Sequence, residues 1–105
     1  MPTAVRLFLT TVATPAQARK LARLLIARRA AACVSILPGA ESHYCWKGRI
    51  LREKECLLLI KSSRNPAQVR ALIRDHHPYE LPELIALPIG WGEPGYLAWV
   101  RETTR

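Results

Sequence analysis

The stretch TPAQARKLAR at residues 14–23 decides the fold, because it recurs 51 residues later as NPAQVRALIR at residues 65–74. Each copy opens with a residue that accepts hydrogen bonds at a helix N-cap, Thr14 or Asn65, and continues with Pro at the first helical position. Gln17 follows Thr14 at the spacing of a capping box. Each copy therefore predicts the start of a helix.

Apolar, β-rich runs precede and follow both predicted helices. Residues 7–12 and 56–60 come before them, and residues 32–37 and 84–87 come after them. This order predicts an α+β fold, the ferredoxin-like β-α-β-β-α-β sandwich. A last amphipathic stretch at residues 94–101 predicts a short C-terminal helix.

The two middle strands are predicted to be unusually long, at residues 33–46 and 49–61, with a hairpin turn at Lys47-Gly48. A strand of fourteen residues spans about 46 Å, whereas a domain of this length has a radius of gyration of about 13 Å. We expect Pro38-Gly39 to bend or bulge the first strand. The hairpin should still project beyond its core, and its edges should pair with other subunits in a closed, symmetric homo-oligomer.

Length and composition indicate the class of protein. A chain of 105 residues, half of them apolar, suits one domain over residues 1–105. No apolar run reaches about 18 residues, and no signal-peptide pattern follows Met1, so we expect no membrane segment. Three cysteines without CxxC spacing indicate a reducing compartment, and we expect a cytoplasmic location.

The net charge of +8 raises nucleic acid or an anionic surface as a partner. The basic residues form no single run, however, and those of the first predicted helix lie mostly on its polar side, as is typical of a solvated face. They are Arg19, Lys20, Arg23, Arg28 and Arg29. No RNP1-like aromatic pattern occurs on a strand. We therefore do not expect nucleic acid as a partner, although a basic RNA-binding module stays open as a third function.

The segment HHPYELPE at residues 76–83 gathers two imidazoles, a phenol and two carboxylates. Its two prolines end the second helix and stiffen the backbone. Because imidazole is the commonest metal ligand, His76 and His77 are candidate ligands. Adjacent helical residues point about 100° apart, however, so the pair does not face one ion while the chain is helical. The alternative is that one imidazole covers the helix C-terminus and the other hydrogen-bonds inside a cleft.

No motif in the chain indicates an enzyme. GxGxxG, Walker, GxSxG and HExxH patterns do not occur, and no nucleophile or acid/base constellation replaces them. Lys61 ends an apolar run and has two interpretations. It either binds an anion or carboxylate in a cleft between subunits, or it marks the point where the strand leaves the core.

Several motifs, in order along the chain, resemble those of the CutA proteins, the divalent-cation tolerance proteins. They are AACV at 31–34, YCWKG at 44–48, HPYELPE at 77–83 and YLAW at 96–99. The resemblance covers nearly the whole chain. It implies a ferredoxin-like fold, a tightly packed homotrimer whose hairpins pair between subunits, and a loose similarity to the PII-type signalling trimers.

The resemblance also implies a cleft between subunits and a relation to metals. The expected cleft residues are Tyr44, Trp46, Glu55, Lys61, His77, Tyr79, Glu80 and Trp99. Copper binding is associated with the family, so we expect a homotrimer that binds Cu(II) or another divalent metal through His76 and His77 in the response to metal ions. Thr10 stands where some members have a copper-linked Cys, which weakens the case for Cu(I), while imidazole suits Cu(II) or Zn. The alternative is a PII-like trimer that binds a small anion or a partner protein through Lys61.

Overall fold

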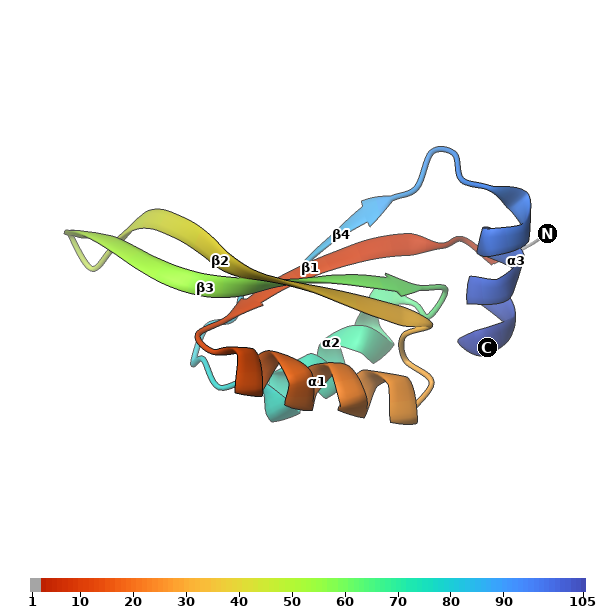
Figure 1. Cartoon of the computed structure of the whole chain (residues 1–105), viewed down its shortest axis with the longest axis horizontal. Coiled ribbons are helices and arrows are strands. Elements are labelled where there is room, and N and C mark those ends of the chain that lie inside the picture. Colours follow the sequence, from red (N-terminus) through yellow and green to blue (C-terminus); the bar gives the residue numbers. More distant parts are fainter. Residues whose placement is uncertain (1–2) are drawn as a thin grey trace.

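The computed structural model describes residues 3–105 and shows an antiparallel sheet with two helices on one face and a third helix at one end (Figure 1). The elements are β1 (Arg6–Val12), α1 (Pro15–Ala27), β2 (Cys33–Trp46), β3 (Arg49–Ser62), α2 (Pro66–His76), β4 (Ile85–Pro88) and α3 (Pro94–Thr103). The strand order is β2-β3-β1-β4. This confirms the predicted α+β, ferredoxin-like arrangement. No helix among residues 3–105 is long and apolar enough to cross a membrane.

The repeated stretch begins both helices as predicted. The Thr14 hydroxyl accepts from the Gln17 backbone N–H at 3.2 Å, and the Gln17 side-chain oxygen accepts from the Thr14 N–H at 3.2 Å, which completes the capping box. The Asn65 side-chain oxygen accepts from the Gln68 N–H at 2.9 Å. A cap of this kind stabilises a helix by about 1 kcal/mol.

The core lies between the two helices and one face of the sheet. Phe8, Leu58 and Ile60 from the strands, with Leu25 and Ile73 from the helices, are at most 1% exposed. Full burial of one such side chain contributes roughly 1.5–3 kcal/mol. This face therefore supplies most of the apolar packing.

The other face of the sheet carries no helix layer, and we call it the open face. Leu37, Ile85 and Leu87 lie on it and are 53%, 51% and 41% exposed. Their cross-strand partners include Leu57 on β3 and Leu9 on β1, so the open face is continuous across the sheet. An apolar sheet face of this kind is normally covered by another layer.

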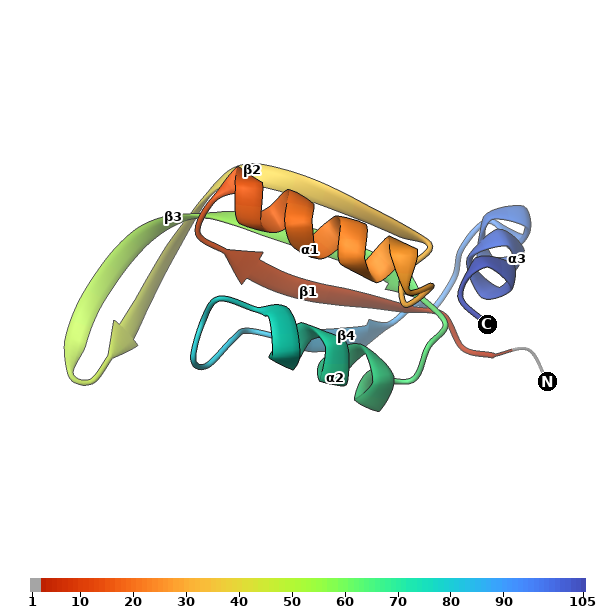
Figure 2. The same cartoon turned by 90° about the horizontal axis from the view of Figure 1, so that it is seen from below.

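β2 and β3 continue past the helices as a projecting hairpin (Figures 1 and 2). The chain extends 46 Å along its longest axis but 26 and 23 Å along the others, and its radius of gyration is 14.3 Å. Lys47 and Gly48 both have positive φ, 51° and 77°, as a type I′ turn requires. The prediction of a projecting hairpin is confirmed.

A β-bulge at Pro38-Gly39 divides the hairpin into an inner and a projecting half, again as predicted. Leu37 pairs with Leu57, but the next paired residue, Ala40, lies opposite Glu55. Two residues of β2 thus oppose one of β3. Gly39 has φ of +83°, in the region that favours glycine.

The bulge changes which side chains of β2 lie on the open face. Because side chains alternate along a strand, one extra residue transfers the following residues to the opposite face. Tyr44 and Trp46 consequently lie on the open face, together with Glu53 and Glu55 of β3. Without the extra residue, the two aromatic side chains would lie on the face opposite the two carboxylates.

Candidate functional site

A groove of about 810 Å³ lies beside the projecting half of the hairpin, against the connector between α2 and β4. Its lining contains four of the eight acidic residues of the chain, Glu53, Glu55, Glu80 and Glu83. Among residues 3–105, no Lys or Arg lines it. On a chain of net charge +8, the groove is therefore a local anionic region that attracts cations.

Two phenols hold two of these carboxylates in place. The Tyr44 hydroxyl donates to Glu53 Oε1 at 2.7 Å, and the Tyr79 hydroxyl donates to Glu55 Oε2 at 2.6 Å. The hydrogen bond to Glu53 raises the pKa of Tyr44 to about 12. Burial, and then the hydrogen bond to Glu55, raise the pKa of Tyr79. Both phenols thus stay protonated donors at neutral pH, and the carboxylates are oriented acceptors.

His77 anchors the connector to β1 through Nε2 and holds the connector's own backbone through Nδ1. Its Nε2 lies 2.8 Å from the Thr11 carbonyl oxygen and 3.1 Å from Thr10 Oγ1, and its Nδ1 accepts from the Tyr79 backbone N–H at 3.1 Å. A carbonyl only accepts, so the proton is on Nε2. The Thr10 hydroxyl in turn donates to the Glu83 carbonyl at 2.6 Å. Burial lowers the pKa of His77, so the ring is neutral and its orientation is fixed.

His76 differs from His77 in its exposure and in its hydrogen bonds. It is the exposed last residue of α2, and its Nδ1 donates to the Leu72 carbonyl at 3.0 Å. The second ring nitrogen of His76, Nε2, makes no hydrogen bond with any of the described residues. The two imidazoles thus follow the alternative drawn from the sequence, one at the helix terminus and one inside. A metal ion at His77 would have to displace an existing bond, whereas Nε2 of His76 is available.

The groove brings together five of the predicted cleft residues. These are Tyr44, Trp46, Glu55, Tyr79 and Glu80, all of which line it. Sequence reasoning missed Glu53 and Glu83 as lining residues. Glu53 shares a strand face with Glu55, which was a usable signal, but its pairing with Tyr44 depends on the bulge.

Lys61 and Trp99, also predicted for the cleft, do not line the groove. The Lys61 ammonium donates to Ser35 Oγ at 2.7 Å and lies 3.8 Å from Cys33 Sγ. Trp99 lies on α3 against Tyr96, with 5.7 Å between ring centroids, and is 46% exposed. His77 also lies outside the lining, so one chain brings together five of the eight predicted cleft residues.

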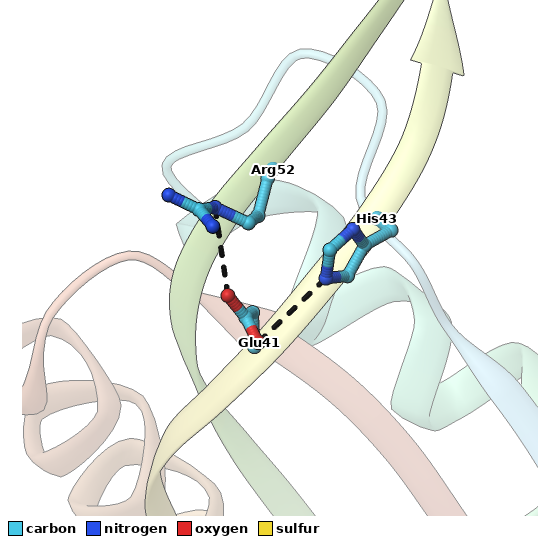
Figure 3. A network of polar contacts seen from close by, with 3 residues as sticks. All are labelled: Glu41, His43 and Arg52. Carbon is cyan, nitrogen blue, oxygen red and sulfur yellow. Dashed lines mark ion pairs between the residues drawn. The ribbon is translucent and has the colours of Figure 1, made fainter.

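An exposed polar network lies on the projecting hairpin, where His43 also contributes to the groove lining (Figure 3). Glu41 lies between the other two side chains, 3.7 Å from His43 Nε2 and 3.5 Å from Arg52 Nε. Exposed ion pairs contribute roughly 0–1 kcal/mol. The network therefore orients the third imidazole more than it stabilises the hairpin.

The donors of one chain do not converge on a metal ion. Among residues 3–105, no group of three His, Cys, Asp or Glu side chains is arranged to hold one. The three cysteines, Cys33, Cys45 and Cys56, are all free thiols. Zn and Cu(II) commonly take three or four protein ligands, so a coordination site of that kind would need donors from a second chain.

Comparison with known proteins gives consistent matches over nearly the full length. The family model described as CutA1 divalent ion tolerance protein matches residues 6–103. The divalent-cation tolerance protein CutA of Thermus thermophilus is 41% identical over 97 residues, which cover 91% of this chain and 94% of that protein.

Two solved structures extend the comparison to the fold. The CutA1 structure from Oryza sativa superposes with a TM-score of 0.94 at 36% identity, over 99% of this chain and 96% of that one. A structure from Archaeoglobus fulgidus, described as a periplasmic divalent cation tolerance protein CutA, gives a TM-score of 0.90 at 30% identity, over 96% of this chain and 99% of that one.

Proposed function

The chain belongs to the family of CutA1 divalent ion tolerance proteins, and on that premise we propose that it is a homotrimer that binds a divalent cation in its acidic groove. One observation carries the cation-binding proposal: half of the acidic residues line one groove of a strongly basic chain. Carboxylates bind divalent ions in general, and an added imidazole would supply the nitrogen donor that suits Cu(II), our first candidate.

The proposed homotrimer would cover what one chain leaves exposed. Leu37, Ile85 and Leu87 form an apolar sheet face without a second layer, and exposed apolar faces of this kind mark protein interfaces. In the proposed trimer, the predicted cleft would take Lys61 and Trp99 from a different chain than the groove residues, because the two do not line the groove of their own chain. Light scattering at micromolar concentration should give three times the chain mass of 11.8 kDa. A monomer would refute the assembly.

Of the two histidines predicted as ligands, we propose His76 as the metal contact and His77 as the residue that positions the connector. The His76 ring is exposed and its Nε2 makes no hydrogen bond within residues 3–105, whereas His77 uses both nitrogens inside the chain. Neither ring lines the groove of its own chain, so His76 would contact a metal in the groove of a neighbouring subunit. Because donors of one chain do not converge, the complete coordination shell would form between subunits.

Calorimetry with Cu(II) tests the groove directly. We expect Glu53→Gln/Glu80→Gln to bind Cu(II) at least about 10-fold more weakly than the wild type, since two carboxylate donors are lost. Glu93→Gln/Glu102→Gln is the matched control, because it removes the same charge outside the groove lining. Equal affinity in both variants would exclude the groove as the metal site. His76→Ala tests the imidazole in the same way.

We propose a binding role for the groove and not a catalytic one. Its phenols and two of its carboxylates satisfy each other, through Tyr44 with Glu53 and Tyr79 with Glu55. Raised phenol pKa values keep these groups in the donor form at neutral pH, which suits a fixed recognition surface better than proton transfer.

We also propose a cytoplasmic location. Three free thiols, one of them the exposed Cys45, suit a reducing compartment. Cell fractionation of the tagged protein tests this location against a periplasmic one, the description attached to the Archaeoglobus fulgidus relative. Recovery in the periplasmic fraction would overturn it.

A further inference from the structure

The repeated helix starts also place four arginines in equivalent positions. Arg19 and Arg23 of α1 correspond to Arg70 and Arg74 of α2, and all four are exposed. Residues four apart on a helix lie on the same side. None of the four is among the buried residues of its helix, which are Ala18, Leu21 and Leu25 in α1 and Val69 and Ile73 in α2. We call these four residues the arginine quartet.

The fold places charges that are far apart in the sequence on two neighbouring helices of one face. α1 and α2 lie side by side and antiparallel on the same face of the sheet (Figure 2), and Lys20 adds a fifth exposed cation. The only acidic residue on the two helices is Asp75, whose Oδ1 lies 3.7 Å from Arg74 Nε. Within residues 3–105, the other three arginines and Lys20 make no ion pair. The helix face is thus basic, while the groove is acidic.

We propose that the arginine quartet and Lys20 bind the phosphate backbone of duplex DNA without reading its sequence. The planar guanidinium pairs with phosphate oxygens through two parallel hydrogen bonds, which makes Arg well suited to this contact. In the sequence, only the net charge of +8 pointed to nucleic acid, because the basic residues form no single run. Charge complementarity appears only when the two helices come together.

The side chains of the helix face favour duplex DNA over other polyanions. An interfacial helix would need large apolar side chains beside its cations, but Ile26 is the only large apolar side chain on α1 and α2 that is strongly exposed. Single strands are bound by aromatic stacking, and neither helix contains Phe, Tyr or Trp. Duplex RNA also presents a phosphate backbone, and the experiment below includes it as a competing ligand.

Fluorescence anisotropy with a labelled DNA duplex of about 20 base pairs, at salt concentrations from about 50 to 200 mM, tests the proposal. The test variant is Arg19→Gln/Arg23→Gln/Arg70→Gln/Arg74→Gln. The matched control is Lys47→Gln/Arg49→Gln/Arg52→Gln/Lys54→Gln on the projecting hairpin, which removes the same four charges from the net +8. Light scattering of both variants checks that the assembly is unchanged.

The test variant should bind at least about 10-fold more weakly, and its salt slope should fall by about three to four, while the control stays within about twofold of the wild type. Equally weakened DNA binding in both variants would mean that only the net charge of the chain matters, and this would overturn the proposal. So would no binding at low salt, or tighter binding to duplex RNA, single-stranded DNA or anionic vesicles. Should the quadruple variant not fold, Arg19→Gln/Arg70→Gln against Lys47→Gln/Arg49→Gln gives the same comparison.

Discussion

The inner half of the β2–β3 hairpin, up to the bulge, and the projecting half beyond it are held by different interactions. In the inner half, Leu58 and Ile60 are fully buried against the helices. In the projecting half, Tyr44, Trp46 and Ile50 are 38%, 42% and 88% exposed, and hydrogen bonds to carboxylates take the place of apolar packing. The inner half thus stabilises the fold, and the projecting half is free to carry the groove and the contacts with other subunits.

The largest difference in stability should appear when one leucine of the inner half and one of the projecting half are each replaced by alanine. Leu58→Ala removes a side chain that is 0% exposed, and we expect a loss of about 2–5 kcal/mol in the free energy of unfolding. Leu51→Ala removes a half-buried groove residue and should cost under about 1 kcal/mol. Urea unfolding of both variants measures the difference. Comparable losses would mean that the projecting half is packed as tightly as the core.

The next comparison is between the stability effects of His76, the last residue of α2, and His77, the first residue of the connector that faces the projecting half. His77→Ala leaves the Thr11 carbonyl and the Tyr79 N–H without their partner, which should lower the free energy of unfolding by about 1–3 kcal/mol. His76→Ala removes an exposed ring and should change it by less than about 0.5 kcal/mol. Chemical denaturation at neutral pH compares the two, and a larger effect at His76 would contradict the assigned roles.

The bulge itself can be tested with two glycines. A Cβ added at Gly39 or at Gly90 meets no atom within 4 Å, but only Gly39 has positive φ, at +83°. Gly39→Ala should therefore cost about 1–2 kcal/mol through backbone strain alone, and Gly90→Ala should be nearly neutral. Equal stability of the two variants, measured by thermal unfolding, would show that the bulge does not depend on glycine.

Most of the fold was predictable because its signals are local. The caps at Thr14 and Asn65, the turn at Lys47-Gly48 and the bulge at Pro38-Gly39 each depend on a few adjacent residues, and all are present. Strand and helix ends differ from expectation by only one or two residues, at the less constrained termini of β1, β3, β4 and α3.

The site was predictable only in part, because its geometry depends on distant contacts. The His77 ring meets Thr10 and Thr11, which are 67 and 66 residues away in sequence. No sequence pattern near His77 indicates that both of its ring nitrogens form hydrogen bonds. In the same way, Tyr44 faces Glu53 only after the bulge is counted, and the basic helix face forms only when α1 and α2 pack together.

The smallest predicted effect is a pH dependence that originates at His77. Burial lowers its pKa below the ordinary 6.5, and the hydrogen bond to the Thr11 carbonyl and then the charge of Glu55 oppose this shift without reversing it. Between the lowered pKa and about 6.5, the unfolded chain therefore binds more protons than the folded chain, so the free energy of unfolding rises with pH and levels off above this interval. His77→Asn, whose amide can still donate to the Thr11 carbonyl, should flatten the rise, while His76→Ala should preserve it. Unfolding curves of both variants from about pH 5 to 8 measure this dependence. If the free energy of unfolding still rises with pH in His77→Asn, the pH dependence belongs to another group.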